Sequence, residues 1–179
     1  IFEACFDWGN CFLDQVIGLH EFQSVLKATE DAMAIVATEW QRNLPHTSAE
    51  IADMLGFEVH GLWDVYITHP GIRQCKNTGK GILWTQQDDW LNYNSVYLWH
   101  EVLHSIFGPT DKEHAIIELI SDNELRVRLN GGDYPPFIGH KYLHDIKAQM
   151  LTEWRNYLLT PNRNIRDLCP HITMTITER

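Results

Sequence analysis

Residues 92–122 read NYNSVYLWHEVLHSIFGPTDKEHAIIELISD, and the expected architecture follows from this stretch. Residues 92–107 are predicted to form a helix, which Gly108-Pro109 stops. A capping box at Thr110 and Glu113 then begins a second helix, expected to run to about residue 129. The stretch therefore predicts two consecutive helices joined by a glycine-proline turn.

The first of these helices contains His100-Glu101-Val102-Leu103-His104, which has the pattern His-Glu-x-x-His. Residues four apart lie above one another on a helix face, so both imidazoles can reach one zinc ion. Glu101 projects beside them, where it can take a proton from water as a general base. The flanking residues are apolar enough to bury this group, which is costly unless a metal ion or hydrogen bonds satisfy it. The motif predicts a Zn²⁺ site for metal-assisted hydrolysis.

A third ligand is expected from the next helix, where Glu118-Leu119-Ile120-Ser121-Asp122 follows. With this Glu-x-x-x-Asp segment after the His-Glu-x-x-His helix, the chain resembles the gluzincins, the thermolysin-like zinc metallopeptidases. The resemblance implies that Glu118 is the third ligand and that Asp122 orients a ligand histidine. It covers only residues 100–122. The connection from His104 to Glu118 is short and no second substrate domain is evident, so the peptidase subclass and substrate stay open.

Other ligand sets are also considered. His114 lies one turn before Glu118 on the same helix face and could be a ligand or a substrate contact. The metzincin pattern does not fit, because it needs glycine three residues after His104 and a ligand at six, whereas Gly108 is at four and Asp111 at seven. Glu118 and Asp122 could also be solvated charges on a helix face. Glu118 is the predicted third ligand.

Polar residues after the zinc helices could fold back over the site. An acyl-transfer site needs a donor for the developing oxyanion, and Tyr134 and His140 are the predicted catalytic residues of this kind. Each histidine there could instead be an exposed helix residue. Lys141 stands where a base glutamate would be between His140 and His144, so a second hydrolytic site is not expected.

The remaining elements point to a single α+β domain over residues 1–179, a mostly helical zincin-like domain with a small β-sheet. The strand at 81–85 could present a free edge to an extended peptide, or its apolar residues could belong to the core. In the N-terminal part we expect one helix or two over 12–40, ended by Pro45, and then a short helix that a Thr47–Glu50 capping box begins and Gly56 closes. The other expected elements are a strand over 57–68, a loop over 71–81, a helix over 140–159 and an edge strand over 172–177.

Composition excludes some classes of partner. A net charge of -10 without a basic patch would repel a phosphate backbone, so nucleic acid is not expected. No apolar run is long enough to span a bilayer, so no membrane is expected either. The four cysteines are scattered, with no Cys-x-x-Cys pair, and fit both a secreted and a cytoplasmic protein. No signal peptide is evident, although the chain begins at Ile1, so the compartment and the oligomeric state stay open.

The predicted function is a zinc-dependent metallopeptidase acting on a peptide or protein substrate, with His100, His104 and Glu118 as ligands and Glu101 as base. Two alternatives remain. The chain could be a catalytically silent zinc-binding interaction or regulatory domain, or a non-peptidase zinc hydrolase that acts on a small amide.

Overall fold

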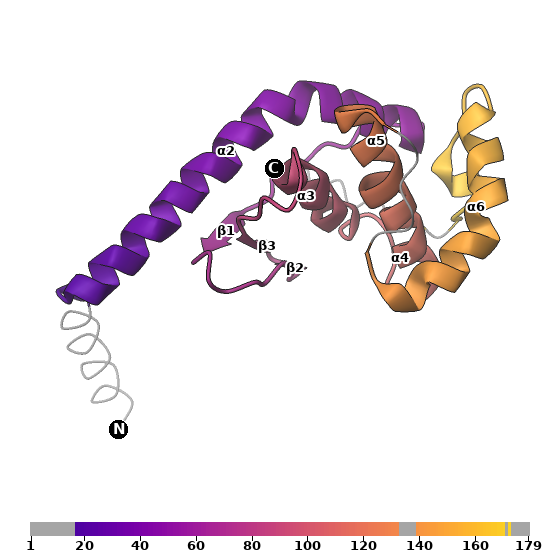
Figure 1. Cartoon of the computed structure of the whole chain (residues 1–179). Helices are drawn as coiled ribbons and strands as arrows, with labels where there is room; N and C mark the ends of the chain where they lie inside the picture. Colours follow the sequence, from indigo (N-terminus) through magenta and orange to yellow (C-terminus); the bar gives the residue numbers. More distant parts are fainter. Residues whose placement is uncertain (1–16, 133–138, 171, 173–179) are drawn as a thin grey trace.

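A computed structural model describes residues 17–132, 139–170 and 172 of the chain (Figure 1). It is mostly helical with a small sheet, which confirms the predicted α+β class. Among the described residues, no helix has the length and apolarity needed to cross a membrane. The α-helices are α2 (His20–Leu55), α3 (Tyr93–Leu103), α4 (Asp111–Glu118), α5 (Arg126–Asn130) and α6 (His144–Leu159).

The sheet has three strands in the order β1-β3-β2. Strand β1 (Val65–Thr68) runs parallel to β3 (Ile82–Thr85), and β2 (Lys76–Asn77) runs antiparallel to β3. The prediction of a strand near 81–85 is confirmed, but only the end of the strand predicted over 57–68 forms. Strand β2 lies in the predicted loop, because a turn in which Thr78 N donates to Gly81 O at 2.9 Å folds these polar residues back onto β3.

Helix α2 continues through Pro45, so the predicted break there is wrong. Proline removes one backbone hydrogen bond, but the helix packs against α3 on both sides of it. Before it, the Trp40 and Trp99 rings are 5.6 Å apart, and after it Trp99 Nε1 donates to Thr47 Oγ1 at 2.8 Å. Thr47 is therefore a buried position inside the helix and not a cap, whereas Gly56 does close the helix with a φ of 79°.

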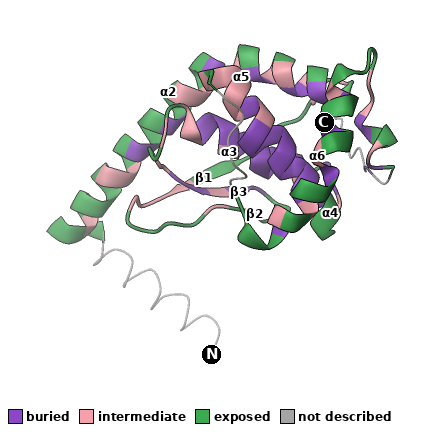
Figure 2. Cartoon of the chain, turned by 45° about the vertical axis from the view of Figure 1, so that its right-hand side comes forward, coloured by how far each residue is buried: buried purple, intermediate pink, exposed green. Residues whose placement is uncertain are grey.

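Helix α3 lies at the centre of the molecule, and most of its residues are buried (Figure 2). The capping box at Thr110 begins α4 as predicted. The helix predicted over 110–129 forms, although its middle is a π-helical segment, Leu119–Leu125, between α4 and α5. Such a segment is rare and occurs frequently at functional sites.

The last predicted helix also forms, as a 3₁₀ turn over Lys141–Leu143 followed by α6. Helix α6 packs beside α4, with the buried ring of Trp154 in the core. The predicted edge strand over 172–177 and the start of the first predicted helix, 12–16, lie outside the described residues, apart from residue 172.

Candidate metal centre

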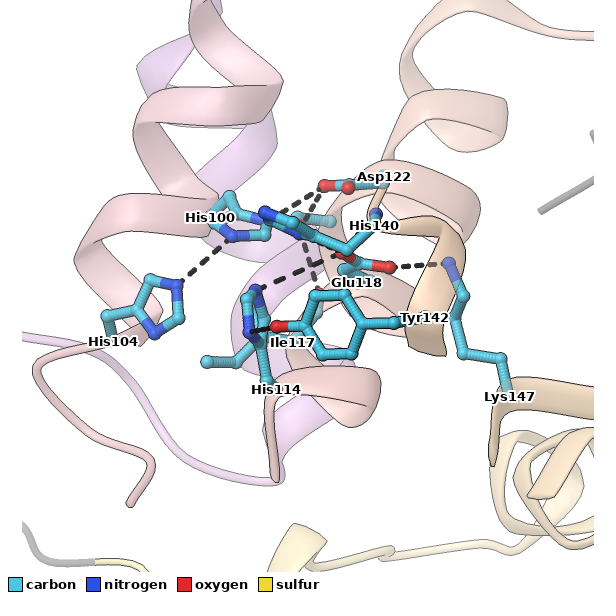
Figure 3. Close-up of polar contacts among 10 residues, drawn as sticks. His100, His104, His114, Ile117, Glu118, Asp122, His140, Tyr142 and Lys147 are labelled. Atoms are coloured by element: carbon cyan, nitrogen blue, oxygen red, sulfur yellow. Dashed lines mark hydrogen bonds and ion pairs between the residues drawn. The ribbon is translucent and has the colours of Figure 1, made fainter. Parts of the chain in front are cut away.

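Helix α3 brings His100 and His104 to one face, as the helical spacing predicts. His104 lies just after the last residue of α3, and its Nε2 is 3.1 Å from Nε2 of His100 (Figure 3). Two imidazole lone pairs at this distance repel each other unless a proton or a metal ion lies between them. Zinc–nitrogen bonds of about 2.0–2.1 Å in a tetrahedral site place two ligand nitrogens about 3.3 Å apart, so the pair has a spacing that suits zinc.

Asp122 in the π-helical segment determines which nitrogen of His100 faces this centre. Its Oδ1 lies 3.0 Å from Nδ1 of His100 and also accepts a hydrogen bond from Ser121 Oγ at 2.8 Å. Because the carboxylate accepts from a protonated Nδ1, the Nε2 lone pair of His100 is left for the centre. The contact that the gluzincin resemblance implies between Asp122 and a histidine of the motif is present.

His114 of α4 is the third imidazole of the centre. The potential ligand atoms of His100, His104 and His114 all lie within 4.8 Å of one another. Nε2 of His114 is buried and has no hydrogen-bond partner among the described residues, while Nδ1 lies 3.3 Å from the hydroxyl of Tyr142. This atom lies 3.9 Å from Glu118 Oε1, too far for a hydrogen bond, and a buried ring nitrogen without a hydrogen bond is costly. The three imidazoles therefore fit a bound zinc ion, which would satisfy this atom.

The electrostatic environment keeps two of these rings neutral, as metal ligation requires. Burial, together with the neighbouring histidines, lowers the pKa of His104 to about 3. Burial and His100 also lower the pKa of His114. Burial alone would lower the pKa of His100, but the carboxylates of Asp122, Glu101 and Glu118 outweigh it and raise this pKa.

Glu101 lies beside the imidazoles and is held from strand β2. Its Oε2 accepts a hydrogen bond from Asn77 N at 2.6 Å, and the side-chain amide of Asn77 donates to Glu101 O at 2.7 Å. Burial raises the pKa of Glu101, although His100 and the Asn77 N–H oppose this shift. A raised carboxyl pKa brings the group closer to that of an effective general base near neutral pH.

Glu118 lies one turn after His114, at the end of α4. It is fully buried, with Oε2 2.5 Å from Lys147 Nζ and Oε1 2.7 Å from His140 Nδ1. His114, Glu118 and His140 form a second group whose potential ligand atoms lie within 4.8 Å of one another. Because the Lys147 ammonium already balances the carboxylate charge, the three-histidine group is the better cation site. A role for Glu118 as third ligand stays a prediction.

A pocket of about 290 Å³ opens beside the centre. His100 and Glu101 meet His140 there, so the predicted base and the predicted oxyanion donor share one space. Tyr134, the other predicted donor, lies outside the described residues. The remaining lining residues are Arg73, Cys75, Trp84, Gln87, Tyr93, Tyr97, Asp122 and Gly139.

Three residues of the site do not follow from the motif. Tyr142 has no sequence signal beyond its place among the polar residues that follow the zinc helices. Asn77 and Lys147 carry no local signal, since each reaches the site from a distant element. His114 has one signal in the sequence, its position one turn before Glu118 on the same helix.

No family model, no curated protein and no solved structure matches this chain. The assignment of function therefore depends on the geometry of the centre.

Proposed function

We propose that this chain is a zinc-dependent metallopeptidase in which His100, His104 and His114 hold the metal ion and Glu101 is the general base. The observation that carries the proposal is the convergence of three imidazoles, within 4.8 Å of one another, next to a buried glutamate. His114 replaces Glu118 as the proposed third ligand because its Nε2 is buried without a hydrogen-bond partner among the described residues.

Each residue of the centre has a separate role in the proposed hydrolysis. A zinc ion would supply Lewis acidity, lowering the pKa of water to about 7 and polarising a carbonyl. Glu101 takes the proton of the attacking water and passes it to the leaving amine. Asn77 holds Glu101 in place, and Asp122 holds His100. His140, at the same pocket, is the proposed donor to the carbonyl oxygen as negative charge develops on it.

The pocket supports a peptide as substrate. Pockets that enclose a whole small molecule usually measure about 300–1,000 Å³, and this one, at about 290 Å³, is at the lower limit. It suits one side chain of a longer substrate. Tyr93 and Tyr97, two half-buried aromatic side chains of α3 that line the pocket, would contact that side chain.

The test is Glu101→Gln, with metal content and hydrolysis measured on the same preparation. We expect about one zinc per chain in both proteins by elemental analysis. Hydrolysis of a peptide library, followed by mass spectrometry, should fall about 10²–10⁴-fold in the variant because the proton acceptor is lost. Glu153→Gln, an exposed glutamate of α6, is the matched control and should cleave like the native chain.

His114→Ala tests the ligand set in the same experiment and should lose the zinc, whereas His46→Ala, an exposed histidine of α2, should keep it. If the native chain binds zinc but cleaves no peptide, and Glu101→Gln has the same zinc content and the same lack of hydrolysis, the result would favour the silent zinc-binding domain. A native chain without zinc after purification in the absence of chelators would contradict the proposal.

A further inference from the structure

A buried ion pair lies beside the metal centre, and the zinc ligands do not require it. Glu118 on α4 and Lys147 on α6 are both fully buried, and Oε2 and Nζ are 2.5 Å apart. Removing two charges from water costs several kcal/mol per ion, and their attraction offsets this only with good geometry and further hydrogen bonds. The second carboxylate oxygen of Glu118 supplies those further bonds.

That oxygen, Oε1, forms its hydrogen bonds with a single residue and lies 3.9 Å from His114 Nε2, too far for a hydrogen bond. It accepts hydrogen bonds from the backbone N–H of His140 at 2.8 Å and from Nδ1 of the same residue at 2.7 Å. Gly139, just before His140, has a φ of +92°, and a Cβ there would lie 2.4 Å from Cδ of Glu118. Only glycine allows the chain to pass so close to the carboxylate. The buried pair thus fixes both the backbone and the ring of His140.

The ring orientation decides which nitrogen of His140 faces the substrate. Because Nδ1 donates to Glu118, Nε2 is left with no hydrogen-bond partner among the described residues. His140 lines the pocket together with His100 and Glu101, and about half of its side chain is exposed. Its Nε2 is therefore the nitrogen available to a group that binds in the pocket.

We infer that Glu118 is a positioning residue for His140, anchored by Lys147, and that it turns His140 Nε2 toward the carbonyl oxygen of the substrate. The inference rests on the proposed hydrolytic function. Both carboxylate oxygens are then engaged by Lys147 and His140, which separates this role from that of a third ligand.

The experiment compares His140→Gln, the double variant Glu118→Gln/Lys147→Met and the combined triple variant. The double variant keeps the buried cluster neutral and nearly equal in size, so that it does not leave an unpaired buried charge. Zinc content should stay at about one per chain in all three. With the library peptide that the native chain cleaves fastest, kcat should fall about 10²-fold in each and KM should change little. The triple variant should be no slower than His140→Gln, because the double change and His140→Gln remove the same interaction with the substrate.

A second measurement does not depend on catalysis. Long-range ¹H–¹⁵N spectra of the zinc-loaded native chain should show His140 protonated at Nδ1, and this signature should be lost in Glu118→Gln/Lys147→Met. Loss of zinc in the double variant would overturn the inference by making Glu118 a ligand. Rate losses that multiply in the triple variant, or an unchanged His140 signature, would also overturn it. A native chain without hydrolytic activity would refute the proposed function, while the spectra would still decide whether Glu118 fixes His140.

Discussion

Asp122 is the residue that links the π-helical segment to the proposed metal centre. Its side chain is fully buried, and one oxygen contacts His100 Nδ1. A carboxylate behind a ligand histidine fixes the ring and increases the basicity of the nitrogen that binds the metal. The other oxygen, Oδ2, has no hydrogen-bond partner among the described residues. The hydrogen bond with His100 therefore offsets much of the free-energy cost of burying this charge.

Asp122→Ala should therefore weaken zinc binding without removing any proposed ligand. We expect the zinc Kd to rise about 10–100-fold, because His100 loses the group that orients it. Competition with a chromophoric chelator measures this change directly. Asp145→Ala, an exposed aspartate of α6, is the control and should leave the Kd unchanged. An Asp122→Ala variant that binds zinc as tightly as the native chain would show that Asp122 has only a structural role.

Among single residues, the motif positions could be predicted because they depend on local spacing alone. A helix places His100 and His104 on one face, with Glu101 at the edge of that face, whatever surrounds it. Spacing cannot separate His114 from Glu118 as a ligand, since both lie on one face of α4. The difference comes from Lys147, which lies on α6 and pairs with Glu118 in the folded chain. No periodicity in the sequence predicts that contact.

Among the elements, α4 depends most clearly on its N-terminal cap. Thr110 Oγ1 accepts from Glu113 N at 3.3 Å, and Glu113 Oε2 accepts from Thr110 N at 3.1 Å. These reciprocal bonds satisfy backbone N–H groups that the first turn of a helix leaves without partners. His114 follows Glu113 directly, so the cap also holds the start of the helix that presents the third imidazole.

Thr110→Ala should lower the free energy of unfolding by about 1 kcal/mol, because a cap hydroxyl is lost without the creation of a cavity. Urea unfolding of the zinc-free protein measures this loss apart from any effect on the metal. Thr152→Ala, at an exposed position of α6, should change stability by less than about 0.5 kcal/mol. Equal stability of the Thr110→Ala variant and the native chain would mean that tertiary packing alone holds the first turn of α4.

The elements differ in how far their sequence predicts them. The capping box at Thr110 and the start of the helix after it are local features, and they form where predicted. The helix before it, α3, ends at Leu103, earlier than the stop predicted at Gly108-Pro109. Helix α2 passes Pro45 because packing of Trp40 and Thr47 against Trp99 outweighs a local break signal. Strand β2 is missed because Lys76 and Asn77 have no strand propensity and form a strand only by pairing with β3.

At the scale of the whole molecule, the proposed centre joins parts of the chain that the fold must bring together. His100 and His104 come from the end of α3, His114 comes from α4, and the intervening turn carries no ligand. A metal ion bound by all three would tie these two helices together in the core. The unfolded chain has no such preformed site, so the free energy of metal binding adds to the free energy of folding.

Removing zinc with a chelator should therefore destabilise the native chain strongly. At free zinc of about 1,000 times the Kd, binding contributes about 4.1 kcal/mol. For a domain of this size each kcal/mol corresponds to about 2–4 °C in Tm, so we expect Tm to fall by roughly 8–16 °C. Differential scanning calorimetry with and without chelator measures the shift in Tm. Adding zinc back to the chelator-treated sample should reverse it. His114→Ala should show the same Tm in both conditions, because it has lost a proposed ligand. A native Tm that does not respond to zinc would mean that the three imidazoles hold no metal. The short distance between the Nε2 atoms of His100 and His104 would then be explained by a proton shared between them.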